Sequence, residues 1–160
     1  MREQTTNIGY VSIDNATIFE IEKFTILWNL FENAKCNYEC SYGKIISMKA
    51  TIEAQKKDAF EILANELNKR AARLGCSVDT YVETKIFPTS GARVSLVNRE
   101  THMPMVIEFI NSGGKTGLVG ALLAIYRIRN NMFHGLKGHK ELDEQIELFK
   151  AMSGVLEESV

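Results

Sequence analysis

The residues best suited to chemistry lie close together in the stretch RIRNNMFHG, positions 127–135. Arg129 and His134 are five positions apart, and Asn130 follows the arginine. An imidazole titrates near neutral pH, so it can accept a proton from a ribose 2′-hydroxyl or donate one to a leaving 5′-oxygen. A guanidinium binds phosphate oxygens and stabilises the charge that develops on phosphorus. These groups suit RNA cleavage without a metal ion.

Helical geometry alone does not bring Arg129 and His134 together. At about 100° per residue they lie about 140° apart around the helix and roughly 7.5 Å apart along its axis. Asn130 is four positions before His134, a spacing that places both side chains on one face. Arg127, Asn131 and His134 also share a face, at spacings i, i+4 and i+7. The spacing is common by itself, because basic residues near a helix end also complement the helix dipole.

The elements around the motif are predicted to be helical. Residues 118–134 are strongly apolar before the motif and are followed by Gly135, which is typical of a helix C-terminus. An amphipathic pattern predicts a last helix over about 140–156.

A first helix is predicted from Asn15 or Thr17 to about residue 34, with Thr17 and Glu20 spaced as a capping box. Its apolar residues cover much of its circumference, which favours a place in the core together with an oligomer contact. Trp28 in this helix is expected in that core or interface rather than as a platform for a base.

The middle of the chain is less regular. Apolar spacing predicts a long helix over about 45–74, ending in basic residues before Gly75. Residues 76–102 contain Pro88 and Gly91 and fit short strands as well as a short helix. We therefore predict one domain, residues 1–160, with an all-α fold. It is an up-and-down bundle of four or five helices with a small irregular insertion around residues 76–102.

The composition of the chain limits how it could bind a nucleic acid and indicates where in the cell it is found. The chain has 160 residues, 45% of them hydrophobic, and a formal net charge of −1. No global positive field exists to hold a polyanion, so a nucleic-acid contact needs a local patch. No signal peptide or membrane-spanning run is recognisable, and three cysteines without an export signal predict reduced thiols and a cytoplasmic protein.

The motif and its setting resemble the HEPN family of helical domains. The family signature is an arginine, usually followed by a polar residue, and then a histidine after four to six positions. Arg129, Asn130 and His134 match it in order, on a penultimate apolar helix followed by one amphipathic helix. The stretch WNLFEN, positions 28–33, resembles the first helix of defence-associated members and indicates Glu32 as an additional site residue.

This resemblance implies a metal-independent endoribonuclease that acts as a homodimer, a toxin or antiphage effector with RNA as its substrate and no cofactor. His134 would be the general acid or base and Arg129 would bind the phosphate. Asn130 would assist these two residues. A second chain would bring its Arg129 into the cleft beside His134. An antitoxin or regulatory protein is a further partner that such effectors have. Arg127 and Asn131 are additional site candidates.

Residues before and after the motif helix bear on RNA binding and on regulation. Lys137 and Lys115 are candidate RNA-binding residues. In a branch of the family a tyrosine modified by a partner enzyme stands two positions after the histidine. Leu136 occupies that position here, so this regulation is not expected.

Two further functions stay open. One is a non-catalytic HEPN module that binds a nucleotide, RNA or a protein; the other is a helical dimerisation scaffold. The stretch SGGKTG lacks the first glycine of a phosphate-binding loop, and we interpret it as a helix-entry loop. Cys36, Cys40 and His102 make a weak zinc set, because a second close pair is missing. His102 and His139 are expected to be exposed.

Overall fold

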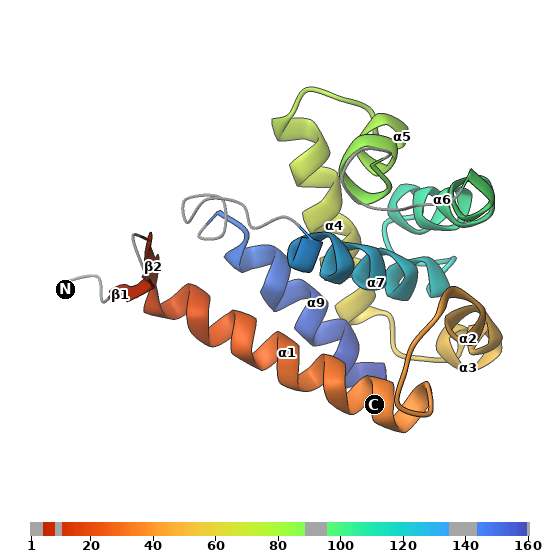
Figure 1. Ribbon diagram of the computed structural model, residues 1–160. Helices are drawn as coiled ribbons and strands as arrows, with labels where there is room; N and C mark the ends of the chain where they lie inside the picture. The colour runs from red at the N-terminus through yellow and green to blue at the C-terminus, as the bar shows by residue number, and fades with distance from the viewer. Residues whose placement is uncertain (1–4, 9–10, 89–95, 135–143, 160) are drawn as a thin grey trace.

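The computed structural model describes residues 5–8, 11–88, 96–134 and 144–159, with the backbone alone at 7–8, 11–12, 96–98 and 133–134 (Figure 1). In this part of the chain, five helices of 14 to 21 residues build the bundle, which confirms the all-α prediction. They are α1 (Asn15–Lys35), α4 (Asp58–Arg73), α6 (Leu96–Asn111), α7 (Val119–His134) and α9 (Ile146–Ser159).

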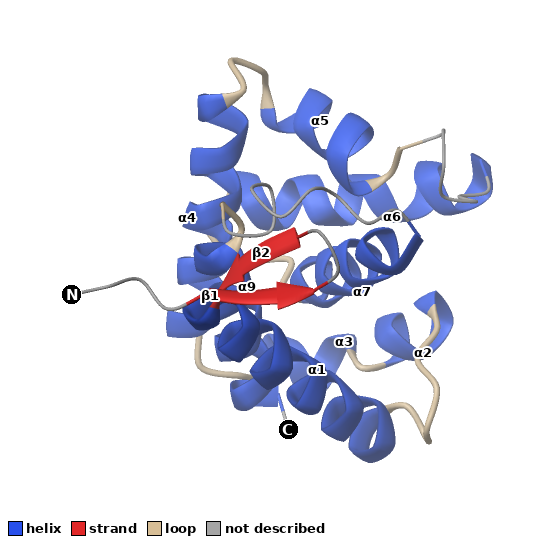
Figure 2. Ribbon diagram, turned by 60° about the vertical axis from the view of Figure 1, so that its left-hand side comes forward, coloured by secondary structure: helices blue, strands red, loops and turns tan. Residues whose placement is uncertain are grey.

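The N-terminal segment has more structure than its polar sequence indicates. Strands β1 (Thr5–Ile8) and β2 (Val11–Asp14) pair antiparallel, with Thr5 opposite Asp14 and Ile8 opposite Val11. The hairpin leads directly into α1 (Figure 2). Because the strand sets where α1 begins, Asp14 is its N-cap, and its side chain does not cap the helix by a hydrogen bond. The predicted Thr17–Glu20 capping box is therefore wrong.

The predicted helix over 45–74 is three helices. Ser41 caps α2 (Tyr42–Ser47) by accepting from the N–H of Lys44, and α3 (Lys49–Glu53) follows after Met48. The buried side chains of Ile45 and Ile52 belong to α2 and α3, which contact α7, whereas α4 packs mainly on α9. Because α2 and α3 pack on α7 and α4 packs on α9, the chain must turn between them. The apolar periodicity that predicted one long helix continues across this break.

The predicted irregular insertion is mostly helical where the structure describes it. Helix α5 (Val78–Tyr81) continues into a π-helix, η1 (Val82–Ile86), and α6 includes the stretch MVIEF. Ser77 caps α5 by accepting from the N–H of Thr80. Pro88 follows η1, and Gly91 lies outside the described residues, so neither η1 nor α6 contains either of them.

The core is formed where α7 crosses the other helices. α9 lies between α1 and α4, and α6 packs along α7 (Figure 1). All residues from Leu118 to Ile125 are buried, so α7 meets protein on every side along its first two turns. Its start is held by Glu53, whose carboxylate accepts from the N–H of Leu118 at 2.8 Å. Large buried side chains from the neighbouring helices complete the core: Phe24, Trp28, Phe31, Phe60, Phe109 and Phe149.

The described helices include none that is long and apolar enough to cross a lipid bilayer.

The closest approach of α6 and α7 predicts a stability effect. A Cβ at Gly120 would lie 2.3 Å from the carbonyl oxygen of Met105 and 2.9 Å from Cβ of Phe109. Gly120→Ala should therefore lower the free energy of unfolding by about 1–3 kcal/mol, because the two helices must separate. Urea unfolding followed by circular dichroism measures this change.

Gly43→Ala is the matched control. Gly43 lies in α2, and a Cβ added there meets nothing within 4 Å. Alanine has a higher helix propensity, so this variant should be as stable as the wild type or more stable by up to about 1 kcal/mol. A Gly120→Ala protein as stable as the Gly43→Ala protein would contradict the close packing of α6 on α7.

Candidate functional site

The polar end of α7 has two sides with different environments, and the first side faces η1. The Arg127 guanidinium is buried and donates from Nε to the Ile86 carbonyl at 3.2 Å and from Nη2 to Asn131 Oδ1 at 2.7 Å. Asn131 Nδ2 donates to the same carbonyl at 3.0 Å and to that of Lys85 at 3.4 Å. The guanidinium also lies 5.6 Å from the ring centroid of Phe87. These two predicted site residues bind the protein's own backbone.

The second side carries Arg129 and Asn130. Arg129 Nη1 donates to Asn130 Oδ1 at 3.1 Å, and the guanidinium lies 5.9 Å from the ring of Trp28. Both residues are partly exposed, whereas Trp28 is 2% exposed, which confirms its prediction as a core residue. The buried indole therefore supports a guanidinium that solvent can reach, an arrangement that favours the charged side chain electrostatically.

A row of aromatic rings connects the two sides to α1, α2 and α6. Tyr126 stacks on Trp28 at 6.1 Å and meets Tyr42 edge-on at 5.0 Å, and Tyr42 stacks on His102 at 4.3 Å. His102 is buried, so the prediction that it is exposed is wrong. The ring of Tyr42 stacks on it and covers it. Burial raises the pKa of the Tyr42 hydroxyl, and the charge of Arg127 and a hydrogen bond from it oppose this rise only in part.

The remaining motif residues are placed less completely. His134 is the last residue of α7, and its side chain lies outside the described residues. Lys137 and His139 also lie outside them. Lys115 is exposed and precedes α7, so the length of that helix, about 22 Å, separates it from the motif of the same chain.

The glycine-rich stretch before α7 is a tight turn. Ser112 Oγ donates to the carbonyls of Phe109 and Thr116 and accepts from the N–H of Thr116. Gly114 has a φ of +79°, and a Cβ there would lie 2.5 Å from the carbonyl oxygen of Phe60. The turn is thus packed against the start of α4. A pocket of about 540 Å³ opens beside it and is lined by Asp58, Glu61, Ile62, Asn65, Asn68 and Gly113.

Glu32 closes the C-terminal end of α1. Its carboxylate accepts from the N–H of Cys40 at 3.0 Å, and its carbonyl accepts from the N–H groups of Cys36 and Tyr38. Cys36 and Cys40 form a disulfide, whereas Cys76 is free. The expectation of reduced thiols is therefore wrong for this pair, because the turn after α1 brings their Cα atoms to 4.9 Å, within disulfide reach. Among the described residues, no cluster of three potential metal ligands occurs.

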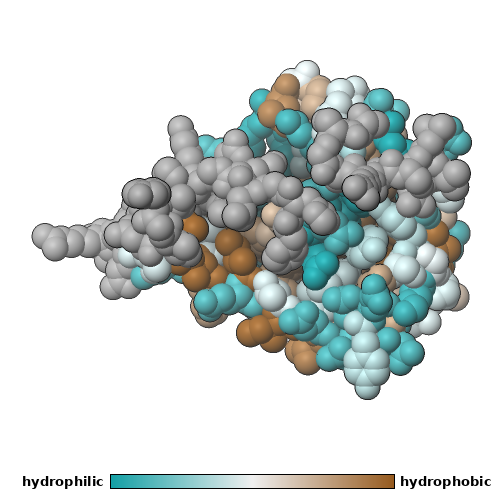
Figure 3. Space-filling model, viewed as in Figure 1, coloured by the Kyte–Doolittle hydropathy of each residue, from teal (hydrophilic) through white to brown (hydrophobic). Residues whose placement is uncertain are grey.

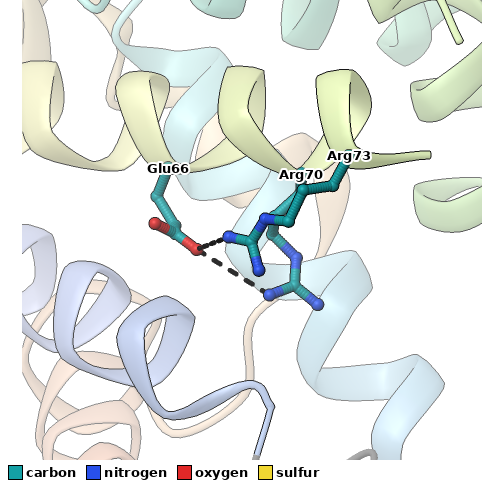
Figure 4. A network of polar contacts seen from close by, with 3 residues as sticks. All are labelled: Glu66, Arg70 and Arg73. Atoms are coloured by element: carbon teal, nitrogen blue, oxygen red, sulfur yellow. Dashed lines mark hydrogen bonds and ion pairs between the residues drawn. The ribbon is translucent and has the colours of Figure 1, made fainter. Parts of the chain in front are cut away.

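A second charged cluster lies on α4 (Figure 4). The largely buried carboxylate of Glu66 lies 3.8 Å from Nη1 of Arg70 and 3.5 Å from Nη2 of Arg73, all on one face of the helix. Burial raises the pKa of the nearby Tyr81 hydroxyl, and Arg70 opposes the rise. The sequence indicated only that these arginines complement the helix dipole. Both arginines instead form ion pairs with one carboxylate, one and two turns earlier on the helix, so the three residues together carry one net positive charge.

The outer face of α1 is apolar. Phe19, Ile26 and Leu30 are 62%, 60% and 50% exposed, and they recur at spacings i, i+7 and i+11. Figure 3 shows apolar surface along this side of the molecule. Trp28 is nine positions after Phe19, so the apolar stripe lies about 180° around the helix from the motif side.

Sequence reasoning missed Tyr42, Tyr126 and the Ile86 carbonyl as parts of the site. Tyr126 was recoverable, since it immediately precedes the motif on the same helix. Tyr42 and Ile86 come from α2 and η1, and nothing in the local pattern of either segment indicates contact with α7. Their roles depend on the packing of distant helices.

No protein-family model, curated protein or solved structure matches this chain.

The raised pKa of Tyr42 predicts a loss of stability in alkaline solution. Below about pH 10 the hydroxyl is neutral in both the folded and the unfolded chain, so it adds no pH dependence. Above about pH 10 the unfolded chain releases the proton first, and the free energy of unfolding falls as the pH rises. Tyr42→Phe should make this fall shallower, as measured by urea unfolding at several alkaline pH values.

The control for this experiment is the same pair of proteins near pH 8. There the variant differs from the wild type by a constant offset, which reflects the lost contact with Arg127. The slope should not vanish, because Tyr81 has a raised pKa for the same reason, burial. Identical alkaline slopes for the wild type and Tyr42→Phe would contradict the raised pKa of Tyr42.

Proposed function

We propose that the chain is a metal-independent endoribonuclease of the HEPN type. Arg129 binds the scissile phosphate, His134 transfers the proton and Asn130 assists. The ribose 2′-oxygen attacks phosphorus, the bond from phosphorus to the 5′-oxygen breaks, and the products carry a 2′,3′-cyclic phosphate and a 5′-hydroxyl. The observation that carries the proposal is the solvent-reachable pair Arg129–Asn130, held on Trp28 five residues before His134.

Electrostatics support a role for Arg129 in binding phosphate. The C-terminus of a helix carries the negative end of its dipole, which by itself repels an anion. The chain also has a net charge of −1, so attraction must come from local cations. With Arg127 buried, the partly exposed Arg129 is the guanidinium of this helix end that a phosphate can reach. Asn130 accepts from Arg129 through its oxygen and keeps its amide N–H groups for donation.

The resemblance on which this proposal rests also indicates the setting. The protein acts on RNA as a cytoplasmic toxin or antiphage effector, it forms a homodimer, and an antitoxin or regulatory protein controls it. The stripe of Phe19, Ile26 and Leu30 supports a self-contact, because large apolar side chains at helical spacing rarely stay uncovered. A dimer built on this stripe leaves the two motifs apart, whereas a dimer built on the α7 ends joins them in one cleft.

The first test is cleavage. The purified protein should cut single-stranded RNA in EDTA and leave 2′,3′-cyclic ends, and Arg129→Ala and His134→Ala should each lower the rate by at least about a hundredfold. Lys56→Ala, at an exposed lysine between α3 and α4, is the matched charge control and should cut at the wild-type rate. Product ends are identified by mass spectrometry.

Circular dichroism must show the same helical content in all four proteins. Cleavage that Arg129→Ala and His134→Ala leave intact would mean that the motif is not the active centre. RNA that is bound without cleavage, with affinity lost in Arg129→Ala, would favour the non-catalytic binding module.

The second test asks whether one cleft uses two chains. Arg129→Ala and His134→Ala proteins are mixed under conditions that exchange subunits. If Arg129 of one chain serves His134 of the other, half of the dimers regain one complete cleft, and about a quarter of the wild-type rate returns. If each cleft is built from one chain, every cleft in the mixture lacks one group, and no activity returns. Light scattering confirms that the mixed species are dimers.

A further inference from the structure

The motif turn of α7 is attached to the protein through Arg127 and Asn131, which lie on the same helix face one turn apart. Both side chains donate to a single acceptor, the carbonyl of Ile86 at the C-terminal end of η1, at 3.2 and 3.0 Å. They are also joined to each other, since Arg127 donates to Asn131 Oδ1 at 2.7 Å. Two residues thus form a closed ring of three hydrogen bonds with one backbone oxygen.

Burial makes this arrangement costly to lose. Arg127 is 5% exposed, and within the described residues none of the ion pairs involves it. A buried cation without a carboxylate is tolerated only if its donors are satisfied by other oxygens. The Ile86 carbonyl and the Asn131 amide oxygen accept from Arg127 here, and the guanidinium lies 5.6 Å from the centroid of the Phe87 ring. Nε and Nη2 therefore donate to the protein rather than to a ligand.

The acceptor itself is held firmly. Ile86 ends a π-helix whose last turn is closed by the N–H of Phe87 donating to the carbonyl of Val82 at 2.9 Å. π-Helical turns are rare, and they often occur at functional positions. At this one the carbonyl points at α7 instead of continuing a helix. The end of η1 therefore provides a fixed reference point for the last turn of α7.

We infer that Arg127 and Asn131 are positioning residues that fix the last turn of α7, which bears His134, to the end of η1. This inference rests on the proposed function, because it assigns these two residues a role in orienting the imidazole rather than in binding RNA. The two faces of α7 thus have different roles. Arg129 and Asn130 bind the substrate, whereas Arg127 and Asn131 hold the end of the helix in a fixed position.

The experiment compares Asn131→Ala, Asn131→Asp and Arg127→Lys with the wild type. Asn131→Asp keeps the acceptor for Arg127 but lacks the donors to Ile86 and Lys85, and a lysine cannot fork to two acceptors as arginine does. Asn29→Ala, an exposed asparagine on α1, is the matched control. Three quantities are measured: hydrogen exchange of backbone amides, affinity for 2′-O-methyl RNA that cannot be cleaved, and the single-turnover cleavage rate at saturating RNA.

The positioning role predicts a specific combination of results. In the three variants, amides at 131–134 should exchange at least about tenfold faster, while those at 121–125 should stay as protected as in the wild type. Affinity for the uncleavable RNA should stay within about twofold, and the cleavage rate should fall by about tenfold to a hundredfold. Arg129→Ala should instead lower the affinity without changing exchange at 131–134.

Two results would overturn the inference. One is a loss of RNA affinity in Asn131→Ala as large as in Arg129→Ala, which would make Asn131 an RNA ligand. The other is unchanged exchange at 131–134, which would show that the contacts with η1 do not hold the turn. A wild-type protein that cleaves no RNA would refute the proposed function. In that case the exchange experiment still decides whether Arg127 and Asn131 fix the helix end.

Discussion

The burial of the first two turns of α7 on all sides constrains the rest of this structure. A helix surrounded by protein can keep polar side chains only at its ends, where backbone groups need partners and neighbouring chains leave space. Both ends of α7 show this. At the N-terminal end, the Glu53 carboxylate accepts a hydrogen bond from the N–H of Leu118. At the C-terminal end, Arg127 and Asn131 both donate to the carbonyl of Ile86. The short elements α2, α3 and η1 all contact α7, as the longer helix α6 does.

The same constraint explains why the polar residues of one short segment lie in two different environments. Successive residues of a helix point about 100° apart, so the four polar residues among positions 127–131 cannot share one environment. Arg127 and Asn131 turn toward η1 and are satisfied inside the protein, whereas Arg129 and Asn130 turn toward Trp28 and solvent. Two arginines two positions apart therefore lie in different environments: Arg127 is buried against η1, and Arg129 is partly exposed beside Trp28.

The aromatic row adds a mechanical link between the motif and the start of the chain. Trp28 on α1 carries both Tyr126 and the Arg129 guanidinium, so movement of α1 would disturb the accessible side of the site. Glu32 and the Cys36–Cys40 disulfide close the end of that helix, one turn beyond the tryptophan. Glu32, expected near the site by resemblance, has a clear structural task in the chain: it caps the turn that returns the backbone to α2.

The sequence by itself determined the helical class of the fold, the extent of α7 and the place of Trp28 in the core. In these segments the apolar residues recur at helical spacing, which predicts a helix with a buried face. It also determined which residues could do chemistry, since the types and order of Arg129, Asn130 and His134 are local properties. Only the tertiary structure decided that 45–74 bends into three helices, that His102 is buried under Tyr42 and that Cys36 meets Cys40. It alone separated Arg127 from Arg129, because that difference depends on the Ile86 carbonyl, 41 positions away in the chain and 3.2 Å away in space. Local propensity reports what one segment prefers, whereas burial and hydrogen-bond partners are set by segments that meet only after folding.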